Sequence, residues 1–254
     1  MTSPYLNKPV SAWLKITKKL LARHPLTTDI ILDVATQAWE SLWNTRVGIG
    51  PTAVKLTQLE VPATVVGYFF EVLFANELER RFPGIWRGCK KGDDKDLVYV
   101  PDPRLSVEIK TSGQLGLKVY GNRSYGQKVQ NQLLTKKEKS GFYITINFFK
   151  QTLMLIRFGW IDADDWKPQA SPTGQMAGLP DDVYQLKLVP IAGNYRLLAP
   201  VAVVPGIGSK TAVELATLGI ETVGDLLLST AALPARILRI RDDIKASYSQ
   251  KQSS

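Results

Sequence analysis

The chain has 254 residues, of which 44% are hydrophobic and 22% are charged, so it is long enough to bury the core of one domain or two. Its single cysteine and single histidine exclude an internal disulfide and a zinc site of Cys and His ligands, so any metal must be held by carboxylates. The sequence has no apolar run of about 20 residues and no signal-peptide pattern, and we therefore expect a cytoplasmic protein with no membrane partner.

Positive charge is concentrated in two segments. The formal net charge is +9, which favours a polyanionic partner such as nucleic acid. Residues 104–139 contain eight Lys and Arg against two acids, Glu108 and Glu138. The first 25 residues add five basic residues and no acid, which fits either a second basic patch or a solvated helix face.

Three helices are predicted near the N-terminus. Apolar residues recur at helical spacing over residues 12–21 and 28–43, and Thr27 or Thr28 can cap the second helix. Residues 64–82 form a strongly apolar run that becomes charged towards its end and stops at Pro83-Gly84. We interpret this run as a buried helix with a polar C-terminal turn.

Strands are predicted in the middle of the chain. Residues 96–100 and 105–109 flank Pro101-Asp102-Pro103, a hairpin pattern that confines the prolines to the turn. Residues 141–149 and 152–160 are rich in β-branched and aromatic residues and predict a second pair. Residues 162–182 are rich in Asp, Pro, Gly and Ser and predict a surface loop, after which strand-like patterning resumes over residues 184–198.

The composition changes near residue 199, where we place a domain boundary. Residues 1–198 form the first predicted domain and residues 199–254 a small helical one. From Val204 onward the sequence predicts a hairpin, a helix, a turn and another helix. The predicted fold class is therefore α/β, a mixed sheet flanked by helices, with a small all-α appendage at the C-terminus.

The main chemical signal is Asp96 followed twelve residues later by Glu108-Ile109-Lys110. Side chains alternate along a strand, so Glu108 and Lys110 point the same way while Ile109 points into the core. The hairpin can bring the Asp96 carboxylate to Glu108, and two carboxylates at one point of a sheet suit Mg²⁺, which prefers oxygen ligands. Such an ion would activate water and neutralise charge on a phosphate, while Lys110 would orient or deprotonate the water.

Other acids and a structural alternative accompany this signal. Asp93 and Asp94 are alternatives to Asp96 as the metal ligand. Glu71 stands inside the apolar run of the third helix, where an acid should be paired or ligated, so we predict an auxiliary acidic residue near the metal. The alternative is a surface strand whose Glu–Lys ion pair has little energetic weight and no catalytic role.

These residues resemble the PD-(D/E)XK nucleases, among which type II restriction endonucleases are prominent. The motif is Asp96 with Glu108-Ile109-Lys110 and a preceding helix that bears Glu71, and Lys95-Asp96 stands in place of Pro-Asp. Residues 107–112 with 121–126 are similar to ScaI-type restriction enzymes. The resemblance covers residues 60–160 and implies a restriction-endonuclease-like fold and Mg²⁺-dependent hydrolysis of duplex DNA that leaves 5′-phosphate and 3′-hydroxyl ends.

The segment after Lys110 is rich in side chains that read base edges in the major groove. Arg binds guanine and Asn or Gln binds adenine through paired hydrogen bonds, whereas Lys and Ser commonly contact phosphates. A polar loop that leads into a solvated helix would have the same composition. The predicted DNA-binding residues here are Asn122, Arg123, Ser124, Tyr125, Gln127 and Lys128.

The C-terminal segment resembles a helix-hairpin-helix element, with Pro205-Gly206-Ile207-Gly208 as its hairpin. Glycines let the backbone approach a phosphate, and free amides at a helix N-terminus bind anions. We therefore predict sequence-independent DNA contacts at Gly206, Gly208 and Lys210. The stretch before the hairpin is short and β-branched, and charge after residue 200 is nearly balanced, so a packing or dimerisation role is the alternative.

Together these features predict a type II restriction endonuclease. Cutting both strands favours a two-fold symmetric homodimer that matches a palindromic site, and a cognate DNA methyltransferase is implied genetically. One alternative is a structure-selective repair or recombination nuclease, because helix-hairpin-helix elements often accompany such activities. A second is a non-catalytic DNA-binding protein in which Asp96, Glu108 and Lys110 are only structural.

Overall fold

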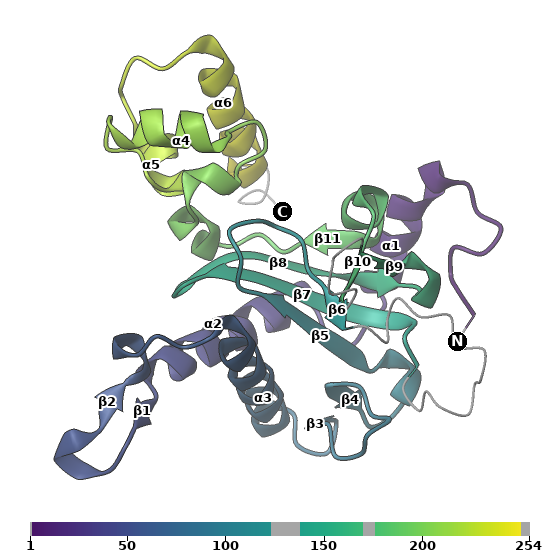
Figure 1. Cartoon of the computed structure of the whole chain (residues 1–254). Helices are drawn as coiled ribbons and strands as arrows, with labels where there is room; N and C mark the ends of the chain where they lie inside the picture. The colour runs from purple at the N-terminus through teal and green to yellow at the C-terminus, as the bar shows by residue number, and fades with distance from the viewer. Residues whose placement is uncertain (1, 123–137, 170–175, 250–254) are drawn as a thin grey trace.

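A six-stranded mixed sheet forms the centre of the molecule. The computed structural model describes residues 2–122, 138–169 and 176–249 (Figure 1). Its strand order is β11-β8-β7-β5-β4-β3, with β5 and β7 parallel and the other neighbours antiparallel. The strands are β3 Trp86–Gly88, β4 Leu97–Tyr99, β5 Val107–Ser112, β7 Gly141–Phe149, β8 Thr152–Ile161 and β11 Leu188–Pro190. The predicted mixed α/β fold is confirmed.

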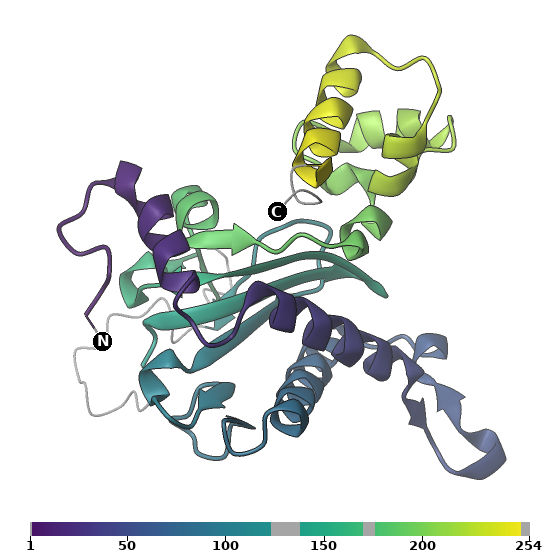
Figure 2. The same cartoon turned by 180° about the vertical axis from the view of Figure 1, so that it is seen from behind.

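The N-terminal helices begin within one residue of their predicted starts, as α1 Trp13–Leu21, α2 Thr28–Asn44 and α3 Ala63–Arg81. Thr27 caps α2, because its hydroxyl accepts a hydrogen bond from the Ile30 amide at 3.3 Å. Between α2 and α3, strands β1 Arg46–Val47 and β2 Val54–Lys55 pair to form an arm that projects from the body (Figure 2). No helix in the described ranges is long and apolar enough to cross a membrane.

Both predicted hairpins are present. Leu97 of β4 stands opposite Val107 of β5, and β7 pairs with β8 along its length. One face of the sheet buries alternate apolar residues such as Ile144 and Phe158 in a core shared with α2 and α3. Each such side chain stabilises the fold by about 1.5–3 kcal/mol. The opposite face of β5, β7 and β8 carries polar residues such as Thr145 and Arg157 beside apolar ones such as Tyr143 and Ile161.

The predicted surface loop at 162–182 is wrong for its described parts. Strands β9 Lys167–Pro168 and β10 Met176–Gly178 form a small sheet with β6 Gly121–Asn122. Trp166 and Ala177 are buried there. The acids Asp162 and Asp165 hold the buried Lys187 ammonium at 2.8 Å each. Composition misled here, because these polar residues pair internally instead of facing water.

The predicted strand over 184–198 is also mostly wrong. A single π-helical turn occupies Val183–Lys187, β11 is three residues long, and a 3₁₀ helix spans Asn194–Leu198. Tertiary hydrogen bonds outweigh the strand propensity of this stretch. The Tyr195 hydroxyl, for example, donates to the Ile191 carbonyl at 2.6 Å and accepts from the Ile156 amide at 3.0 Å.

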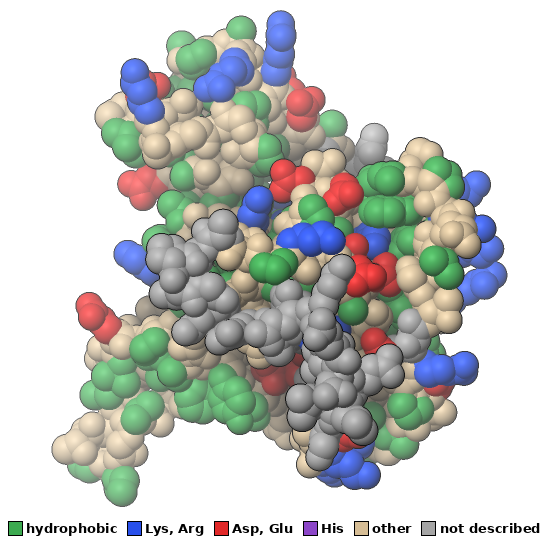
Figure 3. Space-filling view, turned by 45° about the vertical axis from the view of Figure 1, so that its right-hand side comes forward, with side chains coloured by type: hydrophobic (Ala, Val, Ile, Leu, Met, Phe, Trp, Pro, Cys, Tyr) green, Lys and Arg blue, Asp and Glu red, His purple; other side chains and the backbone are tan. Residues whose placement is uncertain are grey.

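Helix α3 is buried on only one side, which corrects the prediction of a buried helix. Phe70 and Phe74 lie in the core. The other side carries four exposed apolar side chains, Val65, Tyr68, Phe69 and Val72. Hydrophobic side chains gather beside the protruding arm in the space-filling view (Figure 3). We call these four residues the apolar side of α3.

The C-terminal segment forms α4 Ser209–Ala216, α5 Val223–Leu228 and α6 Ala235–Ser249, which gather beyond the sheet (Figures 1 and 2). Leu215, Leu226 and Ile237 share a hydrophobic cluster of their own, which Met154 of β8 also joins. The helices after the hairpin are confirmed, and α6 is an addition to them. The stretch before the hairpin forms only a short 3₁₀ helix, Val201–Val203. The domain boundary near residue 199 stays a prediction.

The packing of β8 against β11 is testable at Gly159. A Cβ at this position would lie 1.8 Å from the Lys187 carbonyl oxygen, a backbone atom that cannot rotate away. We expect Gly159→Ala to lower the free energy of unfolding by about 2 kcal/mol or more in urea denaturation. Gly92→Ala, which meets nothing within 4 Å, is the matched control. Equal stability of the two variants would contradict this packing.

Candidate active site

Strand β5 presents its side chains to two environments. Val107 and Ile109 lie in the main core. On the other side, the Lys110 Nζ lies 2.7 Å from Oε1 of Glu108. This ion pair requires both side chains to leave the strand on the same face, so the predicted alternation is confirmed.

Asp96 joins the pair from the start of β4. Its Oδ2 accepts a hydrogen bond from the backbone amide of Ile109 at 2.7 Å. Strand β4 begins only at Leu97, so the Asp96 side chain satisfies an edge amide of β5 that would otherwise need another strand residue. The contact holds the Asp96 carboxylate beside the peptide that joins Glu108 to Ile109.

The three charged groups form one buried cluster. Asp96 is 8% exposed and Glu108 only 2%. Burial by itself lowers the pKa of Lys110, but the negative charges of Glu108 and Asp96 outweigh burial and hold that pKa above its ordinary value. Lys110 therefore lies within electrostatic reach of both carboxylates.

The two neighbouring aspartates are placed elsewhere. The Arg87 guanidinium lies 2.7 Å from Asp94, and this contact lowers the pKa of Asp94 to about 2. Asp94 also accepts hydrogen bonds from the amides of Lys90 and Lys91. Asp93 is exposed to solvent. Of the three aspartates, only Asp96 contacts the strand that carries Glu108 and Lys110.

A cavity of about 420 Å³ opens at Lys110, beyond the point where β4 stops pairing with β5. Glu71 of α3 lines one side of it and Asn122 of β6 another. Two of the predicted site residues therefore share a cavity with Lys110. Gly113 lets the end of β5 approach α3 closely, because a Cβ would lie 2.5 Å from the Cβ of Ala63.

Sequence reasoning missed other polar residues that line this cavity, Thr64, Tyr68, Gln114 and Tyr120. A signal was available on α3, where Thr64 and Tyr68 share a helical stripe with Glu71. It also missed Lys95, a buried residue whose Nζ donates to the Glu138 carbonyl at 2.6 Å. That ammonium lies 5.1 Å from the centroid of the Tyr143 ring.

The donor set fits a hard divalent cation. Asp96, directly before β4, and Glu108 of β5 carry carboxylate oxygens, and Mg²⁺ is commonly held by one or two carboxylates with water and substrate phosphates. Within the described ranges, no three His, Cys, Asp or Glu side chains gather as a metal cluster. Glu71 lines the cavity with Lys110, and its role as an auxiliary acid stays a prediction.

The predicted DNA-binding residues fall in two regions. Asn122 is exposed, in β6 opposite Met176 of β10. Its neighbours in the prediction, Arg123, Ser124, Tyr125, Gln127 and Lys128, lie outside the described residues.

At the C-terminus, Gly206, Gly208 and Lys210 are exposed around the start of α4. Gly206 has φ +87°, a left-handed conformation that favours glycine, and Arg236 donates to its carbonyl at 2.9 Å. Gly208 is the N-cap residue of α4. The hairpin therefore turns where the sequence predicted, and its DNA contacts stay a prediction.

Comparison with known proteins gives a family match. The model of the ScaI restriction endonuclease family matches residues 3–192. The type II restriction enzyme ScaI of Streptomyces caespitosus is 36% identical over 197 residues, which cover 74% of this chain and 84% of that protein. No solved structure shows significant similarity to the chain. The family match includes the cavity and ends before α4.

The buried Glu108–Lys110 pair is testable by a double-mutant cycle. Removing either charge alone leaves the other buried with less compensation, whereas removing both restores neutrality. We expect the losses in free energy of unfolding caused by Glu108→Gln and Lys110→Met to be non-additive by about 2 kcal/mol in metal-free urea denaturation. Additive losses would contradict the pairing. The same cycle on the solvent-exposed Arg104–Asp102 pair is the control and should give a coupling of about 0–1 kcal/mol.

Proposed function

The chain belongs to the ScaI restriction endonuclease family, and from this membership we propose that Asp96, Glu108 and Lys110 form a magnesium-dependent centre of the PD-(D/E)XK type. It is a type II restriction endonuclease, a site-specific deoxyribonuclease whose substrate is double-stranded DNA. We propose in addition which residues carry out the chemistry, which metal they bind and how the chains assemble.

The convergence of three side chains at one edge of β5 carries the proposal. Asp96 reaches the amide of Ile109, and Lys110 contacts Glu108, although Asp96 lies before β4 and Lys110 lies in β5. If Glu108 and Lys110 were only an ion pair on a surface strand, Glu108 would be exposed to water, whereas its side chain is 2% exposed. Burying such charges is costly, and active sites are among the places where proteins do so.

Each residue has a distinct proposed role. Asp96 and Glu108 would hold Mg²⁺, which when bound neutralises phosphate charge and makes water more acidic. Lys110, held by Glu108, orients the attacking water and stabilises the charge that develops on the phosphate oxygens. Glu71 faces the same cavity and serves as an auxiliary acid. The water attacks phosphorus and the 3′ oxygen leaves, which yields 5′-phosphate and 3′-hydroxyl ends.

DNA contacts are proposed in two places. Asn122, which lines the catalytic cavity, begins the polar segment that we propose reads base edges, with Arg123 and its neighbours following. Gly206, Gly208 and Lys210 would hold the phosphate backbone without regard to sequence. This division assigns catalysis and recognition to residues 1–198 and a helix-hairpin-helix contact to residues 199–254.

A homodimer is proposed because one centre must be matched by a second to cut both strands. The apolar side of α3 supports this assembly, since exposed apolar patches mark interaction surfaces and Tyr68 of this side also lines the catalytic cavity. Pairing there would place two cavities close together. The enzyme would act in the cytoplasm beside a cognate DNA methyltransferase that protects the host's own sites.

The catalytic assignment predicts sharp differences between neighbouring acids. We expect Asp96→Asn, Glu108→Gln and Lys110→Met to lower the cleavage of unmethylated phage DNA in Mg²⁺ by about 10²-fold or more, because each removes a charge at the reacting phosphate. Asp94→Asn, which removes the charge that pairs with Arg87, should keep discrete cleavage bands. Full activity of Glu108→Gln, or equal loss in Asp94→Asn, would contradict the assignment.

The dimer surface is testable with two valines of equal exposure. Val72 on the apolar side of α3 and Val100 in the β4–β5 turn are both 46% exposed. We expect Val72→Lys to weaken dimerisation by about tenfold or more in sedimentation analysis, since it desolvates a charge at the interface. Val100→Lys should leave the dimer unchanged. Dimers of equal strength in both variants would contradict this surface.

A further inference from the structure

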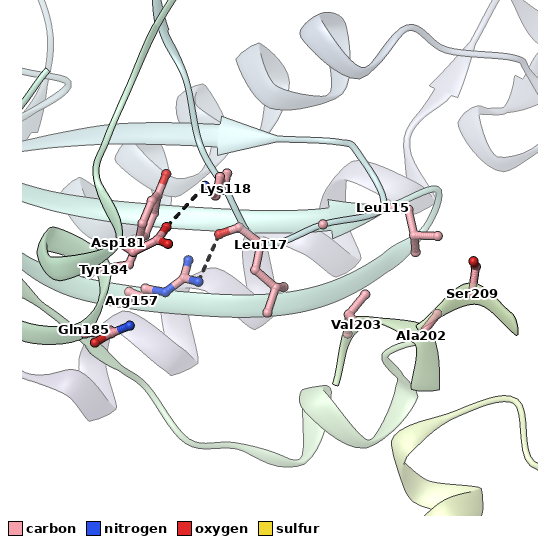
Figure 4. A pocket seen from close by; sticks show the side chains of 11 residues that line it. Leu115, Leu117, Lys118, Arg157, Asp181, Tyr184, Gln185, Ala202, Val203 and Ser209 are labelled. Carbon is pink, nitrogen blue, oxygen red and sulfur yellow. Dashed lines mark hydrogen bonds and ion pairs between the residues drawn. The ribbon is translucent and has the colours of Figure 1, made fainter. Parts of the chain in front are cut away.

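The chain between β5 and β6 forms one wall of the catalytic cavity without support from a sheet. Gln114 and Tyr120 of this segment line the cavity. No backbone–backbone hydrogen bond joins residues 114–119 to any described part of the chain. A second cavity of about 440 Å³ lies behind them, between the segment and Val203 of the C-terminal region (Figure 4). No ladder of backbone hydrogen bonds therefore sets the position of this wall, although Val119 packs in a buried cluster and Leu117 against another.

Side chains from the sheet hold its backbone instead. The Arg157 guanidinium of β8 donates to the Leu117 carbonyl at 3.0 Å, a contact visible in Figure 4. The Asn147 amide of β7 donates to the Lys118 carbonyl, also at 3.0 Å. Arg157 and Asn147 are themselves joined at 2.8 Å. Two successive carbonyls are thus bound by one connected pair of side chains.

Tyr184 holds the next residue. Its hydroxyl accepts a hydrogen bond from the Val119 amide at 2.9 Å and donates to the Val119 carbonyl at 3.1 Å. The Tyr184 ring also stacks near Arg157, with the guanidinium carbon 5.2 Å from the ring centroid. The Val119 side chain is fully buried. Three side chains therefore fix three consecutive residues of the wall, and we call Asn147, Arg157 and Tyr184 the clamp.

Two members of the clamp, Asn147 and Arg157, stand in the same sheet as β5. In the sheet register, Lys110 of β5 stands beside Thr145 of β7, which stands beside Arg157 of β8. Ser112 likewise stands beside Asn147. Because cross-strand neighbours share a face, Asn147 and Arg157 rise from the face that carries Lys110, whereas Tyr184 belongs to the π-helical turn Val183–Lys187. Hydrogen bonds from these two strand residues therefore tie the wall to the sheet that holds Lys110.

Burying the Arg157 guanidinium costs more free energy than packing alone would require. Arg157 is 6% exposed, and no carboxylate of the described residues forms an ion pair with it. Burial lowers its pKa to about 10, which leaves it charged at neutral pH. An apolar side chain of similar volume would pack there at lower cost. What the guanidinium adds is the geometry of two simultaneous hydrogen bonds, to Asn147 and to Leu117.

We propose that Asn147, Arg157 and Tyr184 are positioning residues for DNA cleavage. They hold the backbone of residues 117–119 so that Gln114, Tyr120 and Asn122 face the DNA at a set distance from Lys110. This inference rests on the proposed catalytic centre. The position of the DNA relative to Lys110 would then depend on side chains that do not themselves contact the DNA.

Two tyrosines provide a matched test. Tyr184→Phe and Tyr195→Phe each remove one hydroxyl that bridges a backbone amide and a carbonyl, but only Tyr184 holds the cavity wall. We expect similar small losses in melting temperature for the two variants. For Tyr184→Phe we also expect KM for DNA to rise about tenfold with a smaller change in kcat, and Val119 amide exchange to accelerate. Tyr195→Phe should keep wild-type KM within about twofold.

A second variant separates positioning from stability. Asn147→Asp still accepts from Arg157, and with a full charge, but it repels the Lys118 carbonyl instead of donating to it. The variant should melt no lower than wild type and still show raised KM. Equal KM in Tyr184→Phe and Tyr195→Phe, or unchanged KM in Asn147→Asp, overturns the proposal. Cleavage by the wild type and by Glu108→Gln is measured in the same experiment, so a wrong assignment of the catalytic centre is detected separately from a wrong assignment of the clamp. Hydrogen exchange of the Val119 amide tests the clamp without any measurement of activity.

Discussion

The hydrogen bond from the Ile109 amide to the Asp96 carboxylate is the contact on which the site depends. Strand β4 pairs with β5 only at Leu97 and Val107, so the edge of β5 beyond that point has amides that need another acceptor. Asp96 is that acceptor, and it is thereby held beside Glu108. On the opposite face, Ile109 is locked into the core. The core and one hydrogen bond together bring two carboxylates and a lysine to one place.

Two walls of different construction enclose the catalytic cavity. Helix α3 supplies one from a regular element packed on the core, and the segment after β5 supplies the other from backbone held by side chains. The elements around the cavity contain arrangements that lower stability. Helix α3 exposes apolar residues to water, and the sheet buries the charges of Glu108 and Arg157. Such costs are expected where an enzyme needs a partner surface and a preorganised site. In the proposed mechanism, the same face of the sheet serves both chemistry and positioning.

Sequence patterns predicted the parts of the fold that depend on interactions between residues close together in the sequence. The period of two placed Glu108 and Lys110 on one face, and the prolines confined the turn of the β4–β5 hairpin. The partial burial of α3 was not predictable, because an apolar run looks the same whether water or protein covers one side. The clamp was not predictable either, since Tyr184 is 65 residues from Val119 along the chain. Contacts of that range depend on the assembled sheet.

An anomalous difference map from a crystal grown with Mn²⁺ tests whether Asp96 and Glu108 hold the metal. We expect a peak contacted by both carboxylates, near Lys110, and loss of that peak in Asp96→Asn. A peak at Asp93 or Asp94, or anywhere away from β5, in an enzyme that cleaves DNA with Mn²⁺ would contradict this assignment.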